Sequence, residues 1–280
     1  MPEVKCFRHL FYGIVHKEKL RKEEIIMGPK YTPLLLEDES LHDLQLNGTW
    51  LIQKDHGFRF GMDAVLLSDF CSTGTKDQVA DFGTGTGIIS ILMAAKSKAN
   101  HIDAFEILPD MADMASRSVL MNGLEEKIKI WNDDCANAAD HIGRNTMDAI
   151  VMNPPYYESG KTLLNPDPDR AIARHQQQDT LDCFLFSSYL CLKGKGKLFM
   201  IYPTSGMLNL FAALRKRHLE PKRLRMIHPF MDKPSNLFMV EAMKDAKPGM
   251  LTDPPLIVYK EQGVSTDEIA RIYGQTRQND

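Results

Sequence analysis

The segment Asn153-Pro154-Pro155-Tyr156 combines groups that suit an amine substrate. Two consecutive prolines end a strand and remove two backbone donors, which leaves bare carbonyl acceptors beside a ligand. An amino group can give one hydrogen to the Asn153 side-chain oxygen and the other to the Pro154 carbonyl, so that its lone pair faces an electrophile. This is catalysis by orientation and by stabilisation of developing positive charge, without a strong base. Tyr156 would stack on the flat π system that carries the amine.

A glycine-rich turn follows an apolar run that ends in Asp81. Gly83, Gly85 and Gly87 permit a tight turn with positive φ and let a ligand approach the backbone. The spacing differs from the G-x-G-x-x-G turn that seats a pyrophosphate, and it lacks the Lys-Ser/Thr ending of a P-loop. S-adenosylmethionine carries no phosphate but has an ammonium group, a carboxylate and a ribose diol. Asp81 can bind the ammonium, while N–H groups of the turn, including that of Thr84, meet the carboxylate.

Acidic side chains end the next two apolar runs, where they would meet the rest of such a cofactor. Glu106 has the position from which a carboxylate accepts both ribose hydroxyl hydrogens. Asp133, Asp134 and Cys135 follow the third run. One carboxylate there can accept from the cofactor's adenine amine, and the next backbone N–H can meet a ring nitrogen. Either aspartate could instead cap the short helix that follows, so both stay candidates.

These groups meet only if a parallel sheet brings the strand ends to one edge. Short β-branched or apolar runs alternate with longer helical patterns from about residue 41, which indicates βαβ units. We predict strands at 78–82, 101–106, 127–132, 147–152 and 196–202. Helices are predicted at 87–97, 109–122, 135–142, 179–192 and 205–218.

The end of the sheet is expected to be antiparallel, because 221–228 and 236–244 are joined by a turn-rich stretch and read as a hairpin. A parallel sheet that ends in such a hairpin is typical of class I methyltransferases. The predicted fold is therefore α/β and Rossmann-like, a seven-stranded mostly parallel sheet with an antiparallel C-terminal hairpin and helices on both faces.

The composition bounds the class of protein. A chain of 280 residues with 43% hydrophobic residues can bury a substantial core. The formal net charge of -3 gives no basic excess, so any nucleic-acid contact must be local. No apolar run approaches the roughly eighteen residues of a membrane span, and we expect a cytoplasmic protein without membrane contact. The five cysteines form no C-x-x-C pair, so we expect neither a disulfide framework nor a metal site.

The predicted organisation has three parts: an N-terminal extension over 1–40, a methyltransferase domain over 41–274 and a tail over 275–280. The extension has mixed charge and no sustained period, and 17–24 reads as a solvated helix or disordered arm. Met27 is an alternative start, because the codons before it could form a purine-rich ribosome-binding sequence.

Together these motifs resemble those of amino methyltransferases in which a glycine loop precedes the NPPY tetrapeptide. More narrowly, the chain resembles the bacterial tRNA(Val) adenine N6-methyltransferases, which modify the adenosine 3′ of the anticodon. The likeness extends over about 41–274, and its more specific marks are 51–54, 57–67, 170–175 and 255–259. One departure is Gln176, where the family normally has Glu.

The resemblance implies a methyl donor, S-adenosylmethionine, with S-adenosylhomocysteine as the product. It also implies that Phe60, Gly61 and Asp63 lie against the methionine end of this cofactor, with Asp63 capping the helix that starts there. A plain helix cap is the alternative role for Asp63. Asn153 would then touch both the cofactor and the amine.

The resemblance also implies an RNA partner, a tRNA. The segment 157–178 shows little secondary-structure signal and adjoins the tetrapeptide, so it is expected to contact the substrate. Two sets of side chains are predicted to meet the RNA: Lys161, Arg170, Arg174 and His175 in this segment, and the basic cluster Arg215, Lys216 and Arg217. We expect a monomer, because no self-complementary apolar stripe stands out.

Three other functions fit parts of the pattern. A glutamine N5-methyltransferase that acts on a protein such as a release factor would present a planar carboxamide to the same tetrapeptide, but no N-terminal helical bundle is evident to hold it. Ribosomal RNA or DNA could be the target in place of tRNA. An RNA chaperone that has lost catalysis would be expected to show a damaged tetrapeptide or glycine turn, and both are intact here.

Overall fold

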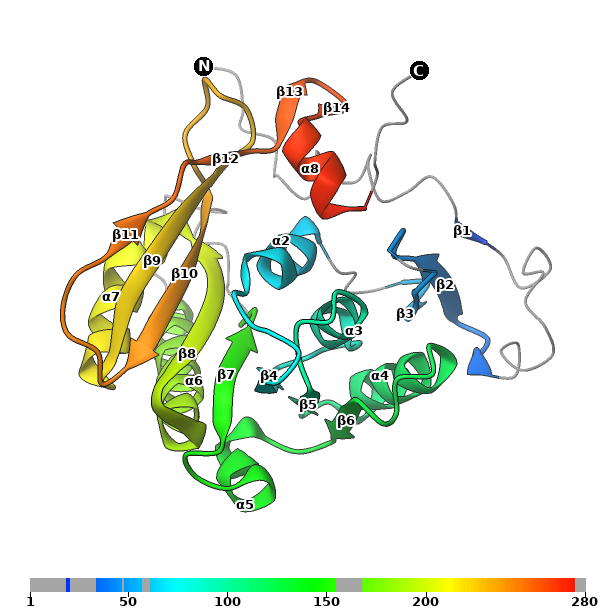
Figure 1. Cartoon of the computed structure of the whole chain (residues 1–280), viewed down its shortest axis with the longest axis horizontal. Helices are drawn as coiled ribbons and strands as arrows, with labels where there is room; N and C mark the ends of the chain where they lie inside the picture. The colour runs from blue at the N-terminus through cyan, green and yellow to red at the C-terminus, as the bar shows by residue number, and fades with distance from the viewer. Residues whose placement is uncertain (1–18, 21–33, 47, 57–60, 155–167, 275–280) are drawn as a thin grey trace.

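A twisted sheet runs through the computed structural model, which describes residues 19–20, 34–46, 48–56, 61–154 and 168–274 (Figure 1). Seven of its strands coincide with the predicted ones: β4 Gln78–Phe82, β5 His101–Phe105, β6 Ile128–Trp131, β7 Met147–Met152, β8 Leu192–Pro203, β9 Leu219–His228 and β10 Leu237–Lys244. Two short strands, β11 Leu251–Thr252 and β12 Leu256–Ile257, both pair with β9 and extend the sheet beyond the seven predicted.

The strand order is β11-β9-β10-β8-β7-β4-β5-β6. From β6 to β8 all neighbours are parallel, whereas β10 is antiparallel to both β8 and β9. The predicted antiparallel hairpin of β9 and β10 is therefore confirmed. Because β10 lies between β8 and β9, β9 points in the same direction as β8.

Helices cover both faces of the sheet, as predicted. On one face, buried side chains of α2, α3, α4 and α8 join the core; on the other, those of α5, α6 and α7 do. Strand β8 shows why two cores form, because Phe199 and Ile201 belong to the first core and Met200 to the second. The helices are α2 Met62–Phe70, α3 Ile88–Ala95, α4 Pro109–Met121, α5 Ala138–Ile142, α6 Pro168–Cys191, α7 Met207–Lys216 and α8 Asp267–Ile272.

The expectation of little secondary structure over 157–178 is wrong from Pro168 onward, because α6 begins there and not near 179. Residues 168–178 are mostly polar, so no apolar face predicted a helix. Pro168 in the first position and Asp169 in the first turn are the signals that favour a helix start. Residues 157–167 lie outside the described part of the chain.

A small antiparallel sheet precedes the main one and packs against α4: β1 Lys19–Leu20, β2 Glu39–Asp43 and β3 Trp50–Lys54. Lys19–Leu20 is thus a short strand, and the predicted helix or disordered arm is wrong for these two residues. Side chains of α4 satisfy part of β3: the Ser118 hydroxyl accepts from the Ile52 N–H, and the Asn122 side chain bonds both backbone groups of Trp50.

The ion pair between Glu39 of β2 and Arg117 of α4 fastens the small sheet to the main domain. Arg117 donates to the two Glu39 carboxylate oxygens at 2.6 and 2.7 Å, and the Glu39 side chain is only 1% exposed. The hydrogen bond to Glu39 raises the pKa of Arg117, so the charge is retained at every accessible pH. This buried pair fixes β2 against α4.

We expect Arg117→Ala to lower the free energy of unfolding by about 3 kcal/mol, because it leaves the Glu39 carboxylate buried without a counter-charge. Arg215→Ala is the matched control, since Arg215 pairs with Glu220 in an exposed position. Loss of that pair is expected to change the same quantity by about 0.5 kcal/mol. Urea-induced unfolding followed by circular dichroism measures both values. Equal effects of the two substitutions would contradict a stabilising role for the buried pair.

Candidate active site

The carboxyl ends of β4, β5 and β7 meet at one edge of the sheet, and the predicted chemical groups follow these ends. The glycine turn after β4 has the predicted left-handed conformation, with φ of 72° at Gly83, 61° at Gly85 and 87° at Gly87. The N–H groups of Gly83 and Thr84 both donate to the Phe105 carbonyl, at 2.9 and 3.0 Å. The turn is thereby fixed to β5 before any ligand binds.

Gly87 has a second reason to be a glycine. A Cβ at this position would stand 3.3 Å from the Ala115 Cβ, a tight contact that would require α3 or α4 to shift slightly. A Cβ at Gly83 would meet the Phe184 ring of α6 at 3.6 Å. Both contacts bring helices up to the turn from opposite faces of the sheet.

Asp81 at the end of β4 is fully buried and only half satisfied. Its Oδ2 accepts from the hydroxyls of Thr84 and Ser90, each at 2.7 Å. Its Oδ1 is also buried, and it has no hydrogen-bond partner. Burial raises the pKa of Asp81 to about 6, against the opposing effect of the two hydroxyl hydrogen bonds. An unsatisfied buried carboxylate oxygen calls for a cation or a strong donor, and the ammonium group of a cofactor fits that demand.

Glu106 after β5 binds the same turn from the other side. Its Oε2 accepts from the Gly85 N–H at 2.9 Å and its Oε1 from the Leu108 N–H at 2.9 Å. The side chain is nearly buried and held by these two bonds, so its direction is set. A carboxylate oxygen has lone pairs for more than one donor. Glu106 can therefore receive a diol while it keeps the turn in place.

The aspartates after β6 have different surroundings. Asp133 accepts from the Asp134 N–H and the Asn137 side chain and pairs with His141 Nε2 at 2.7 Å. The hydrogen bond with His141, followed by that from Asn137, lowers the pKa of Asp133. Asp134 caps the short helix η3, Cys135–Asn137, by accepting from the Ala136 N–H. The cap is thus Asp134, and Asp133 holds the turn to α5.

Asn153 follows β7 and has the feature on which the amine chemistry depends. Its side-chain Oδ1 is buried and has no hydrogen-bond partner. Pro154 is buried beside it and can donate no hydrogen bond from its backbone. Asn153 therefore provides an unpartnered acceptor at the end of β7, the strand that pairs with β4 before the glycine turn. Pro155 and Tyr156 lie outside the described residues.

The start of α2 differs from the expectation in one respect. Gly61 occupies the cap position with extended backbone and no side-chain cap, while Asp63 is the second residue of the helix. The prediction that Asp63 caps this helix is therefore wrong. Asp63 instead adds negative charge to the first turn, and its Oδ1 lies 3.6 Å from the place of a Cβ on Gly61. Phe60 lies outside the described residues.

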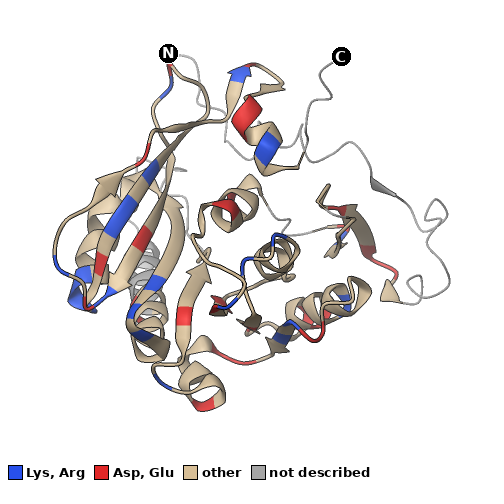
Figure 2. Cartoon of the chain, in the orientation of Figure 1, with Lys and Arg blue, Asp and Glu red and all other residues tan. Residues whose placement is uncertain are grey.

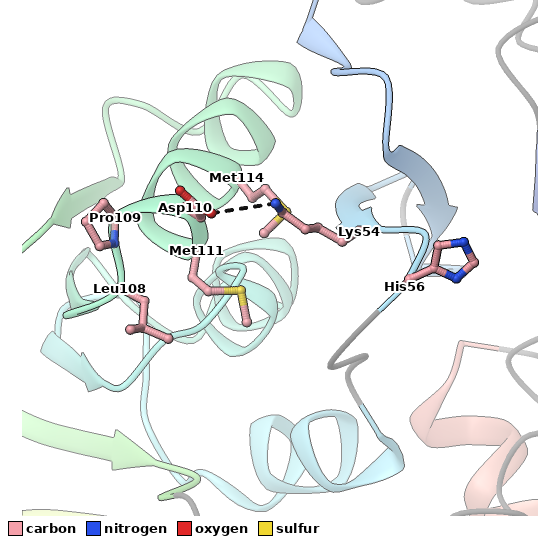
Figure 3. Close-up of a pocket in the computed structure, with 7 residues that line it drawn as sticks. All are labelled: Lys54, His56, Leu108, Pro109, Asp110, Met111 and Met114. Carbon is pink, nitrogen blue, oxygen red and sulfur yellow. Dashed lines mark ion pairs between the residues drawn. The ribbon is translucent and has the colours of Figure 1, made fainter.

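A pocket of about 420 Å³ opens beside the first turn of α4 (Figure 3). Methionine, leucine and proline side chains form its apolar wall, and Lys54 crosses it towards Asp110, 3.6 Å away. Lys54 also pairs with Asp38 at 3.3 Å, so its charge is already compensated. The lining residues are Lys54, His56, Leu108, Pro109, Asp110, Met111 and Met114.

The basic cluster Arg215, Lys216 and Arg217 does not meet the other site residues. It ends α7, which follows the carboxyl end of β8 and returns to the amino end of β9, so it lies at the edge of the sheet opposite to Asn153. Arg215 is paired with Glu220, and Arg217 with Asp182. Figure 2 shows Lys and Arg segments along β9 and at the end of α7. RNA that contacts this cluster would have to span the depth of the sheet.

The other predicted set of basic residues lies only partly within the described residues. Arg170, Arg174 and His175 belong to the backbone of α6, but their side chains lie outside the description, as does Lys161 altogether.

Sequence reasoning missed Ser90 and Phe184. A single serine within the apolar run 88–94 was a local signal for Ser90. No local signal pointed to Phe184, because its contact with Gly83 bridges distant parts of the chain.

The described residues contain no group of three or more histidine, cysteine, aspartate or glutamate side chains arranged to hold a metal ion. Among the helices described, none combines the length and apolarity that crossing a membrane demands.

The sequence is similar to those of curated methyltransferases. Among curated proteins, the tRNA1(Val) (adenine(37)-N6)-methyltransferase of Parabacteroides distasonis is 29% identical over 194 residues, which cover 68% of this chain and 79% of that protein. The protein of the same name from Aliivibrio salmonicida is 26% identical over 215 residues, 76% of this chain and 88% of that protein.

Solved structures show the fold. A predicted O-methyltransferase from Agrobacterium tumefaciens superposes with a TM-score of 0.62 at 19% identity, over 76% of this chain and 96% of that one. TYW2 of M. jannaschii, solved in complex with AdoMet, gives 0.53 at 14% identity, over 75% and 88%. The predicted class I methyltransferase fold is confirmed.

A family model described as the methyltransferase small domain matches residues 61–207, more than half of the 280 residues. The chain therefore belongs to the methyltransferase small domain family.

Proposed function

We propose that this protein transfers a methyl group from S-adenosylmethionine to the exocyclic N6 of an adenine in tRNA, the adenosine 3′ of the anticodon in tRNA(Val). The observation that carries the proposal is the buried, unpartnered Oδ1 of Asn153, beside a glycine turn that follows a second buried, unpartnered oxygen, Oδ1 of Asp81. The printed names of the relatives from Parabacteroides distasonis and Aliivibrio salmonicida support the choice of substrate.

The cofactor's place follows from the donors and acceptors at the strand ends. Asp81 Oδ1 has the charge and burial to accept from an ammonium group, and Glu106 has the direction to accept from a ribose diol. The N–H groups of Gly83 and Thr84 already donate to the Phe105 carbonyl and that of Gly85 to Glu106, so the carboxylate of the cofactor would have to meet other donors. When bound, S-adenosylmethionine supplies the methyl group as a sulfonium electrophile. No phosphate is needed, in agreement with the spacing of Gly83, Gly85 and Gly87.

The chain's own contribution to methyl transfer is orientation of the amine. Asn153 Oδ1 accepts one amine hydrogen and the Pro154 carbonyl accepts the other, so the nitrogen lone pair is directed away from both. As the nitrogen bonds to carbon it becomes positive, and the same two oxygens stabilise that charge. The methylated nitrogen is ammonium-like and acidic. It afterwards loses a proton, and water can accept that proton. Tyr156 is proposed to stack on the extruded adenine.

A test of the proposed function uses the purified full chain with S-adenosylmethionine labelled in its methyl group. Total tRNA, ribosomal RNA, DNA and a protein extract serve as separate acceptors, each followed by hydrolysis and chromatography. We expect label in N6-methyladenosine from the tRNA fraction alone. Label found in methylglutamine of the protein extract would contradict adenine methylation, and label in rRNA or DNA only would contradict tRNA as the substrate.

We propose that Asp134, and not Asp133, accepts from the adenine amine of the cofactor. Asp133 is already held by three donors, whereas Asp134 makes one bond to the Ala136 N–H beside the turn. Asp134→Asn keeps a capping oxygen but loses one acceptor, so we expect a roughly fivefold weaker affinity for S-adenosylhomocysteine. Asp133→Asn is the matched control and should change affinity less. Isothermal titration calorimetry measures both, and the reverse order would refute the assignment.

A further inference from the structure

Asn236 directly precedes β10 and lies at the same edge of the sheet as Asn153. Asn153 follows Met152 of β7, which is opposite Met200 of the parallel strand β8. Just after β8, the Thr204 N–H donates to the Asn236 carbonyl at 2.9 Å, and β10 then runs back along β8. Asn236 is therefore two strands across from Asn153 and a few residues beyond its level, about 10 Å in each direction.

The backbone around Asn236 is fixed, but its side-chain oxygen is unused. The hydroxyls of Thr204 and Ser235 are hydrogen-bonded at 3.1 Å, and the Ser235 hydroxyl donates to the Leu237 carbonyl at 2.7 Å. The Oδ1 of Asn236 is buried and has no hydrogen-bond partner. A buried acceptor without a donor costs stability, so its presence indicates a donor that arrives with a ligand.

The surroundings of Asn236 are open to a large ligand. Asn236 itself is half-buried. Met231, in the turn between β9 and β10, is 83% exposed, and Leu208, in the first turn of α7, is 82% exposed. Both segments lie at the carboxyl edge, because β8 and β9 end there. This edge thus presents exposed apolar side chains, which suit the faces of bases, beside a fixed polar group, which suits a sugar.

We propose that Asn236 binds the ribose of the target adenosine, and that its Oδ1 accepts a hydrogen bond from the 2′-hydroxyl. The inference rests on the proposed function, because it takes the target amine to lie at Asn153. Two asparagine side chains and one nucleoside together span the separation of the two residues. An ionised phosphate has no hydrogen to donate, so the acceptor selects the sugar and not the phosphates. Since DNA lacks the 2′-hydroxyl, Asn236 favours RNA over DNA.

Asn236→Ala in the full chain removes the acceptor without breaking a hydrogen bond to Oδ1. We expect kcat/KM for tRNA(Val) to fall roughly fivefold, as for a hydrogen bond between uncharged groups. The affinity for S-adenosylhomocysteine, measured by calorimetry, should be unchanged, and the melting temperature of the ligand-free protein should not fall. Asn145→Gly is the matched control at the opposite edge, before β7. Asn145 Oδ1 accepts from Lys244 at 2.7 Å, and its φ of 56° suits glycine, so this variant should lower the melting temperature and leave kcat/KM unchanged.

A tRNA(Val) with a single 2′-deoxyadenosine at the target position tests the proposed contact. The wild-type protein should methylate this tRNA with a kcat/KM that is roughly fivefold lower than for the all-ribose tRNA. In Asn236→Ala, the loss of the 2′-hydroxyl should change kcat/KM little, because the acceptor is already gone. Unchanged kcat/KM in Asn236→Ala, independent multiplicative losses, or weaker binding of S-adenosylhomocysteine would overturn the inference. If the wild-type chain methylates no tRNA, the proposed function fails instead, so the two failures are distinguishable.

Discussion

Asn153→Ala is expected to lower kcat about a thousandfold, which is the size of loss found when a preorganised polar group at the reacting centre is removed. The affinity for S-adenosylhomocysteine is expected to stay within about twofold of the wild-type value. The expectation follows from the unpartnered Oδ1 of Asn153. An acceptor that makes no bond in the free protein is used only when an amine arrives. Its removal leaves the amine lone pair undirected and its developing charge unstabilised, which affects turnover and not cofactor binding.

The same structural fact predicts that Asn153→Ala leaves folding intact. No hydrogen bond to Oδ1 is broken, so the melting temperature should not fall. Asn153→Asp is the control variant, because it keeps an oxygen at the acceptor position with nearly the same shape. We expect it to retain more activity than Asn153→Ala. Single-turnover rates with labelled cofactor and tRNA measure both variants. An alanine variant as active as the wild type would refute the role of Asn153 in holding the amine.

The parts of this protein that were predictable from sequence are those set by local periodicity and by turn residues. Strand β7 is a short apolar run closed by two prolines, and β4 is one closed by a glycine turn, so each bound could be read within a few residues. The parallel order then places Asp81, Glu106 and Asn153 at one edge without further information. The candidate site was therefore predictable because its members lie at the carboxyl ends of neighbouring strands.

The parts that sequence did not reveal depend on contacts between distant segments or on strand direction. Helices α2 and α8 are far apart in the chain, and only the folded structure packs one against the other. Strand β1 pairs with β2 from within a stretch of mixed charge, where no period indicates a strand. The place of the basic cluster at the end of α7 follows from the topology, because a helix that follows a parallel strand returns to the opposite edge of the sheet.

Asp81→Asn is expected to weaken the affinity for S-adenosylhomocysteine at pH 8 on the order of a hundredfold, the effect of removing one partner of a buried charge pair. In the free protein, however, the buried Asp81 carboxylate lowers the stability of the fold when it is ionised. Burial raises its pKa from 3.8 to about 6, so the folded state binds a proton more tightly than the unfolded chain. The stability that this proton supplies is fully present below pH 3.8 and is lost as the pH rises to about 6. That interval corresponds to about 3 kcal/mol.

Cofactor affinity should have the opposite dependence on pH. An ammonium group pairs with the ionised carboxylate, so wild-type affinity is expected to fall about tenfold per pH unit below pH 6 and to level off above it. Asp81→Asn should abolish this slope and should not lower the melting temperature at pH 8. Ser90→Ala removes one hydroxyl that stabilises the ionised form, which should move the midpoint above pH 6. Calorimetric titrations from pH 5 to pH 8 measure these curves. A wild-type affinity independent of pH in this range would contradict this prediction, which requires Asp81 to titrate near pH 6 and to pair with the ammonium in its ionised form.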